Sequence, residues 1–113
     1  MNKNYYWYKA TVVRIIDADT IVLDIDLGMH LTREETVRLY RINAFELRGH
    51  EKYFGLKAKT FVEDFCPVNS AVDVHTYKDK AGKYGRLLAD IYVEDECLND
   101  RLVEEEHARY VSY

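Results

Sequence analysis

The sequence contains little proline and cysteine and no long apolar run. Pro67 is the one proline, and the two cysteines, Cys66 and Cys97, lack the spacing of a metal site. No stretch approaches the roughly 18–20 apolar residues that a membrane span needs, and no repeat, linker or low-complexity segment is visible. These absences argue against a membrane-spanning protein, a cysteine-based zinc module and a multidomain chain.

The first residues, MNKNYYWYKATVV, also lack the apolar block and small-residue cleavage site of a secretory signal. We therefore expect either a cytoplasmic protein or a secreted one from which a leader has been removed. In a reducing cytoplasm both cysteines are expected to be buried free thiols rather than a disulfide.

What the sequence does contain fits a globular core. Its 113 residues are 48% hydrophobic and 32% charged, which predicts one soluble domain over residues 1–113. The net charge is −4, a value that disfavours a general nucleic-acid binder. Residues 1–90 nevertheless carry 14 Lys/Arg and 13 Asp/Glu, whereas residues 91–113 carry 2 and 7. Phosphate contacts depend on local basic groups, so the acidic last fifth does not exclude them.

Hydrophobic periodicity predicts the elements. Alternating segments rich in β-branched and aromatic residues indicate five strands, at 8–16, 20–27, 36–42, 70–78 and 86–93. A 3.6-residue period predicts a helix over 50–65 that ends before the proline, with these apolar residues on one face: Tyr53, Leu56, Ala58, Phe61, Val62 and Phe65. A short acidic helix is expected over 98–108, and the final ARYVSY can be extended.

This order of elements indicates the fold class. Three strands, a helix, two strands and a helix do not alternate as in a doubly wound parallel sheet. A mostly β, α+β protein with two or three helices is the better interpretation, and closing the sheet into a barrel would remove exposed edges. We predict a five-stranded OB-fold Greek-key barrel with a helix between strands three and four.

Polar residues cluster where these strands end. Each has an unremarkable explanation: a turn cap for the two aspartates, a structural ion pair for the embedded arginine, and solvated charges for the others. The number of polar residues at strand ends nevertheless indicates a functional site, because strand ends of a barrel can meet in one pocket. The residues are Asp17, Asp19, Arg38, Asn43, Glu46, Lys83, Tyr84 and Arg86.

The set suits phosphodiester hydrolysis. Oxygen ligands from Asp19, Asn43 and a loop carbonyl match Ca²⁺ or Mg²⁺. The Glu46 carboxylate can accept a proton from an attacking water. Two guanidinium groups, Arg38 and Arg86, can hold a phosphate while negative charge builds on its oxygens.

Three segments, in order, resemble the staphylococcal nuclease (thermonuclease) family. IIDADT at 15–20 is similar to the family's Ile-Asp-Gly-Asp-Thr corner, and VRLYRINAFE at 37–46 to its Arg-Leu…Ile-Asp-Thr/Ala-Pro-Glu segment. KYGRLLADIY at 83–92 is similar to its Lys-Tyr-Gly-Arg segment, and LNDRLVEEEHARY to the helix that follows. The resemblance runs from about residue 10 to residue 113.

The resemblance implies an OB-type barrel and a Ca²⁺-dependent nuclease that cuts DNA and RNA with little sequence choice, leaving a 3′-phosphate and a 5′-hydroxyl. It implies that Asp19, Asn43 and the Ala44 carbonyl bind the cation, with Asp17 behind them. Glu46 would be the general base and would touch the cation through water.

The same resemblance assigns the substrate contacts. Arg38 and Arg86 would hold the scissile phosphate. Lys83 and Tyr84 would contact a terminal phosphate of the nucleotide. A base-stacking tyrosine would be Tyr110 or Tyr113, because the alignment slips there.

Three positions depart from the family pattern. Asn43 stands where aspartate is usual, which removes a charge and predicts weaker cation binding. Ala18 replaces a corner glycine, which requires a negative φ there or costs about 1 kcal/mol. Phe45 replaces the proline before Glu46, which predicts a looser hold on that carboxylate.

Three hypotheses follow from the sequence. The first is an active nuclease with DNA or RNA as substrate, no membrane partner, and a monomeric state. The second is a catalytically weak or inactive OB-fold module that binds nucleic acid or protein, favoured by Asn43, Phe45 and the acidic C-terminal segment. The third is a structural role in which the acidic helix forms an interface.

Overall fold

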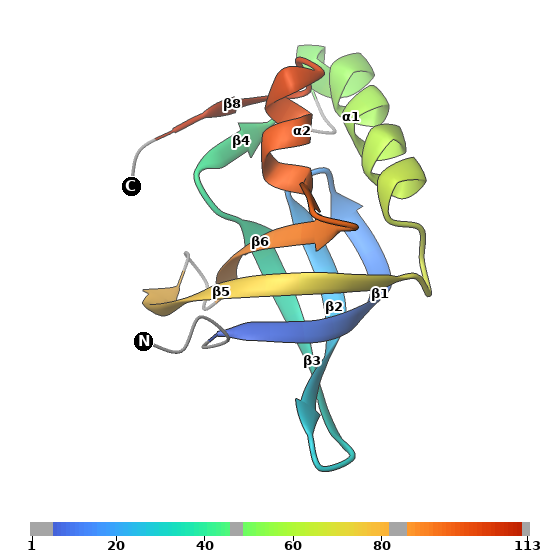
Figure 1. The fold of residues 1–113 in the computed structure, drawn as a ribbon. Coiled ribbons are helices and arrows are strands. Elements are labelled where there is room, and N and C mark those ends of the chain that lie inside the picture. The colour runs from blue at the N-terminus through green and yellow to red at the C-terminus, as the bar shows by residue number, and fades with distance from the viewer. Residues whose placement is uncertain (1–5, 46–48, 82–85, 112–113) are drawn as a thin grey trace.

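The structure is a computed structural model that describes residues 6–45, 49–81 and 86–111. Five strands form a closed barrel, two short strands form a second sheet, and two helices cover one end of the barrel (Figure 1). The barrel strands are β1 (Trp7–Asp17), β2 (Thr20–Gly28), β3 (Leu31–Leu39), β5 (Ala71–Ala81) and β6 (Leu87–Val93). The remaining elements are β4 (Ile42–Ala44), a 3-10 turn (Gly49–Glu51), α1 (Lys52–Phe65), β7 (Glu96–Cys97), α2 (Leu98–Glu104) and β8 (Ala108–Tyr110).

The strand order is that of an OB barrel. Neighbours run β3-β2-β1-β5-β6, and all of these pairs are antiparallel. The barrel closes through a parallel pairing of β3 with β6, in which Val37 faces Leu87 and Arg38 faces Leu88. The predicted mostly β, α+β fold with a helix between the third and fourth barrel strands is confirmed.

The inward residues of the strands make one core. Ile21, Leu23, Val37 and Ile91 are fully buried inside the barrel. The helices close one end by burying small or aliphatic side chains against it: Ala58, Val62, Leu98 and Leu102. This buried apolar surface is the main stabilising term of the fold.

Helix α1 faces the core with a different set of residues from the predicted one. Ala58 and Val62 are buried as expected, and Gly55 lies beside them on the same face. Tyr53 and Leu56, however, are 62% and 49% exposed, so their predicted burial is wrong. A helix with small residues at these spacings approaches the barrel closely, which turns the bulkier side chains outward.

The third strand was predicted to start and end too late. It starts at Leu31, directly after a tight turn in which Met29 and His30 have positive φ. The side chains in the first part of this strand are not buried, so hydrophobic periodicity did not indicate a strand there. Cross-strand pairing with β2 stabilises this part of β3 instead. It ends at Leu39, because Arg41 takes a left-handed φ of 70° and breaks the ladder.

The acidic helix is also shorter than predicted. It ends at Glu104 rather than residue 108, and the His107 N–H donates to the Leu102 carbonyl at 2.8 Å as the chain reverses. Ala108–Tyr110 then forms β8, which confirms the extended state expected for that part of ARYVSY. β8 pairs with β4 and forms the second sheet.

Two smaller expectations are confirmed. Both cysteines are buried free thiols, and burial raises the pKa of the Cys66 thiol to about 12. Ala18 is 1% exposed and is not among the described residues with positive φ, so the corner needs no glycine.

No helix in the described part of the chain combines the length and the hydropathy required to cross a bilayer.

Candidate active site

Asp19 lies at the corner between β1 and β2, with its carboxylate turned toward β4. One oxygen, Oδ2, accepts a hydrogen bond from the Ala44 N–H at 3.0 Å, and the other accepts from the Thr20 hydroxyl at 3.2 Å. The Asp19 backbone carbonyl accepts from the Leu39 N–H at 2.9 Å. The corner is therefore fixed against both β3 and β4, and the side chain remains 16% exposed.

Arg38 projects from β3 toward the same place. Its guanidinium group donates to the carbonyls of Leu39 and Ile42, both at 2.9 Å, and lies 3.5 Å from Asp19 Oδ2. It also donates to the side-chain oxygen of Asn43. The turn that ends β3 wraps around this cation, whose side chain is only 14% exposed.

Asn43 and Ala44 reach the site because β4 is held by β8. Asn43 pairs with Arg109 and Ala44 with Ala108 in this two-stranded sheet. Without that support the segment after β3 would be an open loop. The structure thus brings Asp19, Arg38 and Asn43 together, as the sequence predicted, and places the Ala44 backbone beside them.

Arg86 and Asp17 occupy flanking positions. Arg86 directly precedes β6, and the pairing of Leu87 with Val37 places it beside the strand that carries Arg38. Asp17 ends β1 opposite Thr20. Both side chains are half-buried. Their assigned roles, phosphate contact for Arg86 and support of the ligands for Asp17, stay predictions.

Four predicted site residues lie outside the described residues: Glu46, Lys83, Tyr84 and Tyr113. The residue before Glu46 is described. The Phe45 N–H donates to the His107 carbonyl at 3.3 Å, a bond that proline at this position lacks, and its ring contacts Phe54 with centroids 5.4 Å apart. These contacts hold the last described residue before the predicted base.

Tyr110, one of the two candidates for base stacking, is in β8 opposite Ile42. Its ring is 53% exposed, and its hydroxyl donates to Asp100 at 2.8 Å. This hydrogen bond is the main cause of a raised pKa for the Tyr110 phenol. The phenol therefore stays neutral well above physiological pH.

The family model for staphylococcal nuclease homologues matches residues 36–113, which include the end of β3 and the whole of β4, β6 and β8. The chain belongs to the staphylococcal nuclease family.

Two relatives are thermonucleases. The thermonuclease of Staphylococcus hyicus is 29% identical over 115 residues, covering 99% of this chain and 63% of the relative. That of Staphylococcus intermedius is 31% identical over 105 residues, covering 90% of this chain and 59% of the relative. The chain thus spans about three fifths of the length of these staphylococcal nuclease relatives.

The residues of this family member that surround Asp19 suit a hard cation. Asp19 and Asn43 provide oxygen atoms, which Ca²⁺ and Mg²⁺ prefer. Within residues 6–45, 49–81 and 86–111, no three His, Cys, Asp or Glu side chains gather as a metal cluster. A complete ligand set would need the Glu46 carboxylate and a backbone carbonyl. In the structure Arg38 contacts the Asp19 and Asn43 oxygens, so a bound cation would share or replace those contacts.

A second polar cluster, which was not predicted from the sequence, lies beside the site. Asp90, 2% exposed, accepts hydrogen bonds from the Tyr77 hydroxyl, from Asn99 at 2.8 Å and from Arg41 at 3.4 Å. Asn99 is fully buried and also donates to the Tyr40 carbonyl at 3.0 Å. The signal was available: an aspartate inside the apolar run LLADIYV needs a buried partner.

Proposed function

We propose that this protein is a divalent-cation-dependent nuclease that hydrolyses phosphodiester bonds in DNA, RNA or both with little sequence choice. The observation that carries the proposal is the placement of the Arg38 guanidinium against the oxygens of Asp19 and Asn43. Membership of the staphylococcal nuclease family and the similarity to two thermonucleases support the same reaction. We further propose that residues 1–113 form one OB-fold domain and act as a monomer.

The proposed ligands are the Asp19 carboxylate, the Asn43 side-chain oxygen, the Ala44 carbonyl and Glu46. Asp17 would support them from the end of β1. We propose Ca²⁺ as the ion, with Mg²⁺ as the alternative. When bound, the cation would supply positive charge that stabilises the negative charge developing on the phosphate.

The chain's own groups would perform the other tasks. Glu46 would accept the proton of the water that attacks phosphorus. Arg38 and Arg86 would donate hydrogen bonds to the phosphate oxygens, whose charge increases in the transition state. Because Arg38 is held at two backbone carbonyls 2.9 Å away, little reorganisation is needed when the phosphate arrives.

The remaining predicted residues would position the nucleotide. Lys83 and Tyr84 would contact a terminal phosphate, and Tyr110 or Tyr113 would stack on a base. Stacking tolerates any base, which agrees with weak sequence preference.

Cleavage should require the cation and Glu46. With Ca²⁺, plasmid DNA and single-stranded RNA should be degraded, and addition of a chelator should stop the reaction. Glu46→Gln keeps the size of the side chain but removes its basicity, so kcat should fall by about a hundredfold. Initial rates measured on a gel or by release of acid-soluble nucleotides check both results.

Glu51→Gln is the matched control, because this acid lies in the 3-10 turn after the predicted base, and its rate should match the parent. Ca²⁺-independent cutting, or a Glu46→Gln variant as active as the parent, contradicts the proposal. Binding of nucleic acid without any cleavage would instead support the second hypothesis, a non-catalytic binding module.

Asn43→Asp should strengthen cation binding. It restores a second carboxylate next to Asp19, and Ca²⁺ affinity rises with ligand charge. We expect the dissociation constant to fall by about tenfold, measured by isothermal titration calorimetry without nucleic acid. Asn43→Ala should weaken binding instead. Equal affinities for all three proteins would remove Asn43 from the ligand set.

A further inference from the structure

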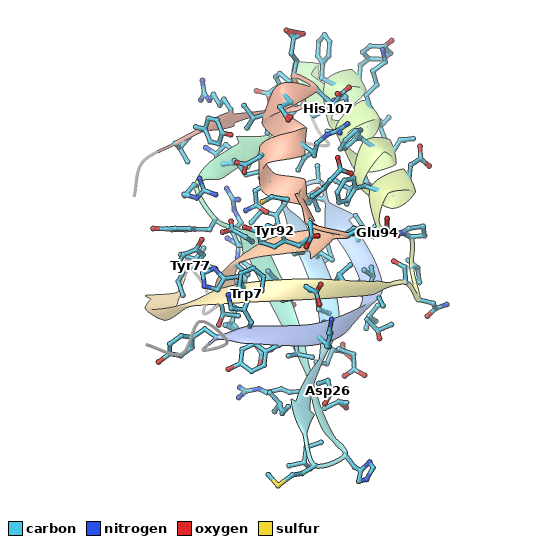
Figure 2. The ribbon with its side chains drawn as sticks, in the orientation of Figure 1. Trp7, Asp26, Tyr77, Tyr92, Glu94 and His107 are labelled. Atoms are coloured by element: carbon cyan, nitrogen blue, oxygen red, sulfur yellow. The ribbon has the colours of Figure 1, made fainter. Side chains whose placement is uncertain are left out.

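Five aromatic side chains form a continuous row on the outside of the barrel, which we call the aromatic strip: Trp7, His75, Tyr77, Tyr40 and Tyr92. The Trp7 ring stacks on His75 with centroids 4.6 Å apart and an angle of 21°. His75 meets Tyr77 edge-on at 4.8 Å, and Tyr77 packs on Tyr40 at 4.3 Å. Tyr92 extends the row, 5.1 Å from Trp7. Figure 2 shows Trp7, Tyr77 and Tyr92 gathered over β5 and β6.

The barrel register produces this row. Trp7 in β1 is directly opposite His75 in β5, and Tyr77 is two residues further along the same face. Val74 and Thr76, which alternate with these residues along β5, point inward and are buried. The strip therefore occupies the outer surface, where hydrophobic burial does not require aromatic residues.

Cross-strand aromatic contacts stabilise sheets, and part of the strip has that role. This role does not account for Trp7, which lies between Tyr92 and His75 in the row and leaves 38% of its surface exposed. Nor does it account for five rings in succession. Tryptophan is costly to expose, and exposed aromatic patches commonly mark binding surfaces.

One end of the strip joins the candidate active site. Tyr40 lies in the turn between Leu39 and Ile42, the two residues whose carbonyls accept the hydrogen bonds of Arg38. A bound strand leaving the site past this turn would meet Tyr40 first. The strip is thus continuous with the place where the scissile phosphate is proposed to bind.

Ion pairs lie beside two rings of the strip, Tyr40 and Trp7. The Arg41 guanidinium lies 6.0 Å from the centre of the Tyr40 ring and is held by Asp90 and Asp100 at 3.4 and 3.9 Å. Lys9, two residues after Trp7 on the same face of β1, is 81% exposed and pairs with Asp73 at 2.7 Å. Because each cation is paired with a neighbouring carboxylate, binding along the strip would depend on base stacking rather than on net charge.

The phenols stay uncharged at physiological pH. Burial, followed by the Asp90 carboxylate, raises the pKa of Tyr77 well above its usual value. Burial also raises the pKa of Tyr92, to about 12. Neither ring therefore adds a negative charge that would repel phosphates.

We propose that the aromatic strip is a stacking platform for single-stranded nucleic acid, which extends the substrate site beyond the nucleotide being cleaved. The ligand is single-stranded because stacking on a flat aromatic row requires unpaired bases. The choice of nucleic acid as ligand rests on the proposed nuclease function. The strip would strengthen binding of long strands and leave the chemistry at the cut unchanged.

The sole tryptophan makes the strip directly observable. Trp7 is the one tryptophan in the chain, so its fluorescence reports on this surface alone. In the presence of chelator, which prevents hydrolysis, a single-stranded oligothymidylate of about 12 nucleotides should quench that fluorescence in a saturable manner. The same length of duplex DNA should quench it much less.

Trp7→Ala should weaken binding of the labelled single strand by about tenfold, measured by fluorescence anisotropy. Trp7→Phe keeps a ring and should restore most of the affinity. Tyr53→Ala removes a 62% exposed ring on α1, outside the strip, and should bind as the parent does. Thermal denaturation of each variant checks that the fold is kept.

The results separate this proposal from the nuclease proposal. Two results would overturn the proposed role of the strip. The first is a single-stranded oligonucleotide that leaves Trp7 fluorescence unchanged. The second is a Trp7→Ala variant that loses affinity equally for single-stranded and duplex DNA. If the strip does not bind nucleic acid but the protein still cleaves a dinucleotide with Ca²⁺, the nuclease proposal stands and the strip proposal fails. Quenching without any cleavage overturns the nuclease and supports the strip.

Discussion

Replacing Arg38 by alanine should lower kcat by about a thousandfold with a much smaller change in KM. The guanidinium is positioned by two carbonyls and lies between Asp19 and Asn43, so it can donate two hydrogen bonds to a phosphate as its charge increases. Preorganised donors of this kind contribute about 10²–10³ in rate. Steady-state kinetics on a single-stranded oligonucleotide measures both constants.

Two comparisons isolate this effect. Arg38→Lys keeps the charge but loses the planar pair of donors, so most of the deficit should remain. Arg33→Ala removes an arginine from the same strand whose side chain is 71% exposed, and it should cut at the parental rate. A fully active Arg38→Ala variant with an unchanged melting temperature would eliminate Arg38 from the catalytic set.

The second large effect concerns stability. Asn99→Ala should destabilise the fold by about 3 kcal/mol, because the amide is fully buried and bonded on every side. It accepts from the Ile91 N–H at 3.3 Å and donates to the carbonyls of Tyr40 and Ala89 at 3.0 and 3.2 Å, and to Asp90. The substitution leaves these groups without partners and opens a small cavity.

Urea denaturation measures the free energy of unfolding, and the thermal midpoint should fall by about 12 °C. Glu104→Ala, at an exposed position on the same helix, should change stability by less than about 0.5 kcal/mol. A loss of stability in Asn99→Ala no larger than in this control would mean that Asn99 does not tie α2 to the barrel.

The sequence was sufficient for the barrel because local pattern and global fold agree there. The alternation in β1, β2, β5 and β6 reflects one buried face, and the order of three strands, a helix, two strands and a helix argued against a doubly wound parallel sheet. The arm of β3 from Leu31 to Glu35 was missed because it buries nothing, and its pairing with β2 is a long-range property. Tyr53 and Leu56 were misplaced because periodicity fixes the pitch of a helix but not its rotation about its own axis.

The candidate site was partly predictable for the same reason. Asp19 lies at the corner between β1 and β2, Arg38 lies near the end of β3, and Asn43 follows in β4; the fold of the barrel brings these positions together. Asp90 inside an apolar run indicated a buried partner, but the sequence does not show that Asn99 of α2 is that partner, because the pairing depends on how the elements pack. The aromatic strip likewise depends on strand register, which period-2 alternation does not specify between strands.

The pairing of β4 with β8 has a consequence for biosynthesis. The segment carrying Asn43 and Ala44 is hydrogen-bonded to residues 108–110, more than sixty positions later in the chain. A nascent polypeptide on the ribosome lacks that partner until the later residues have emerged. The constellation around Asp19 would therefore be completed only after residues 108–110 have been synthesised, among the last events of folding.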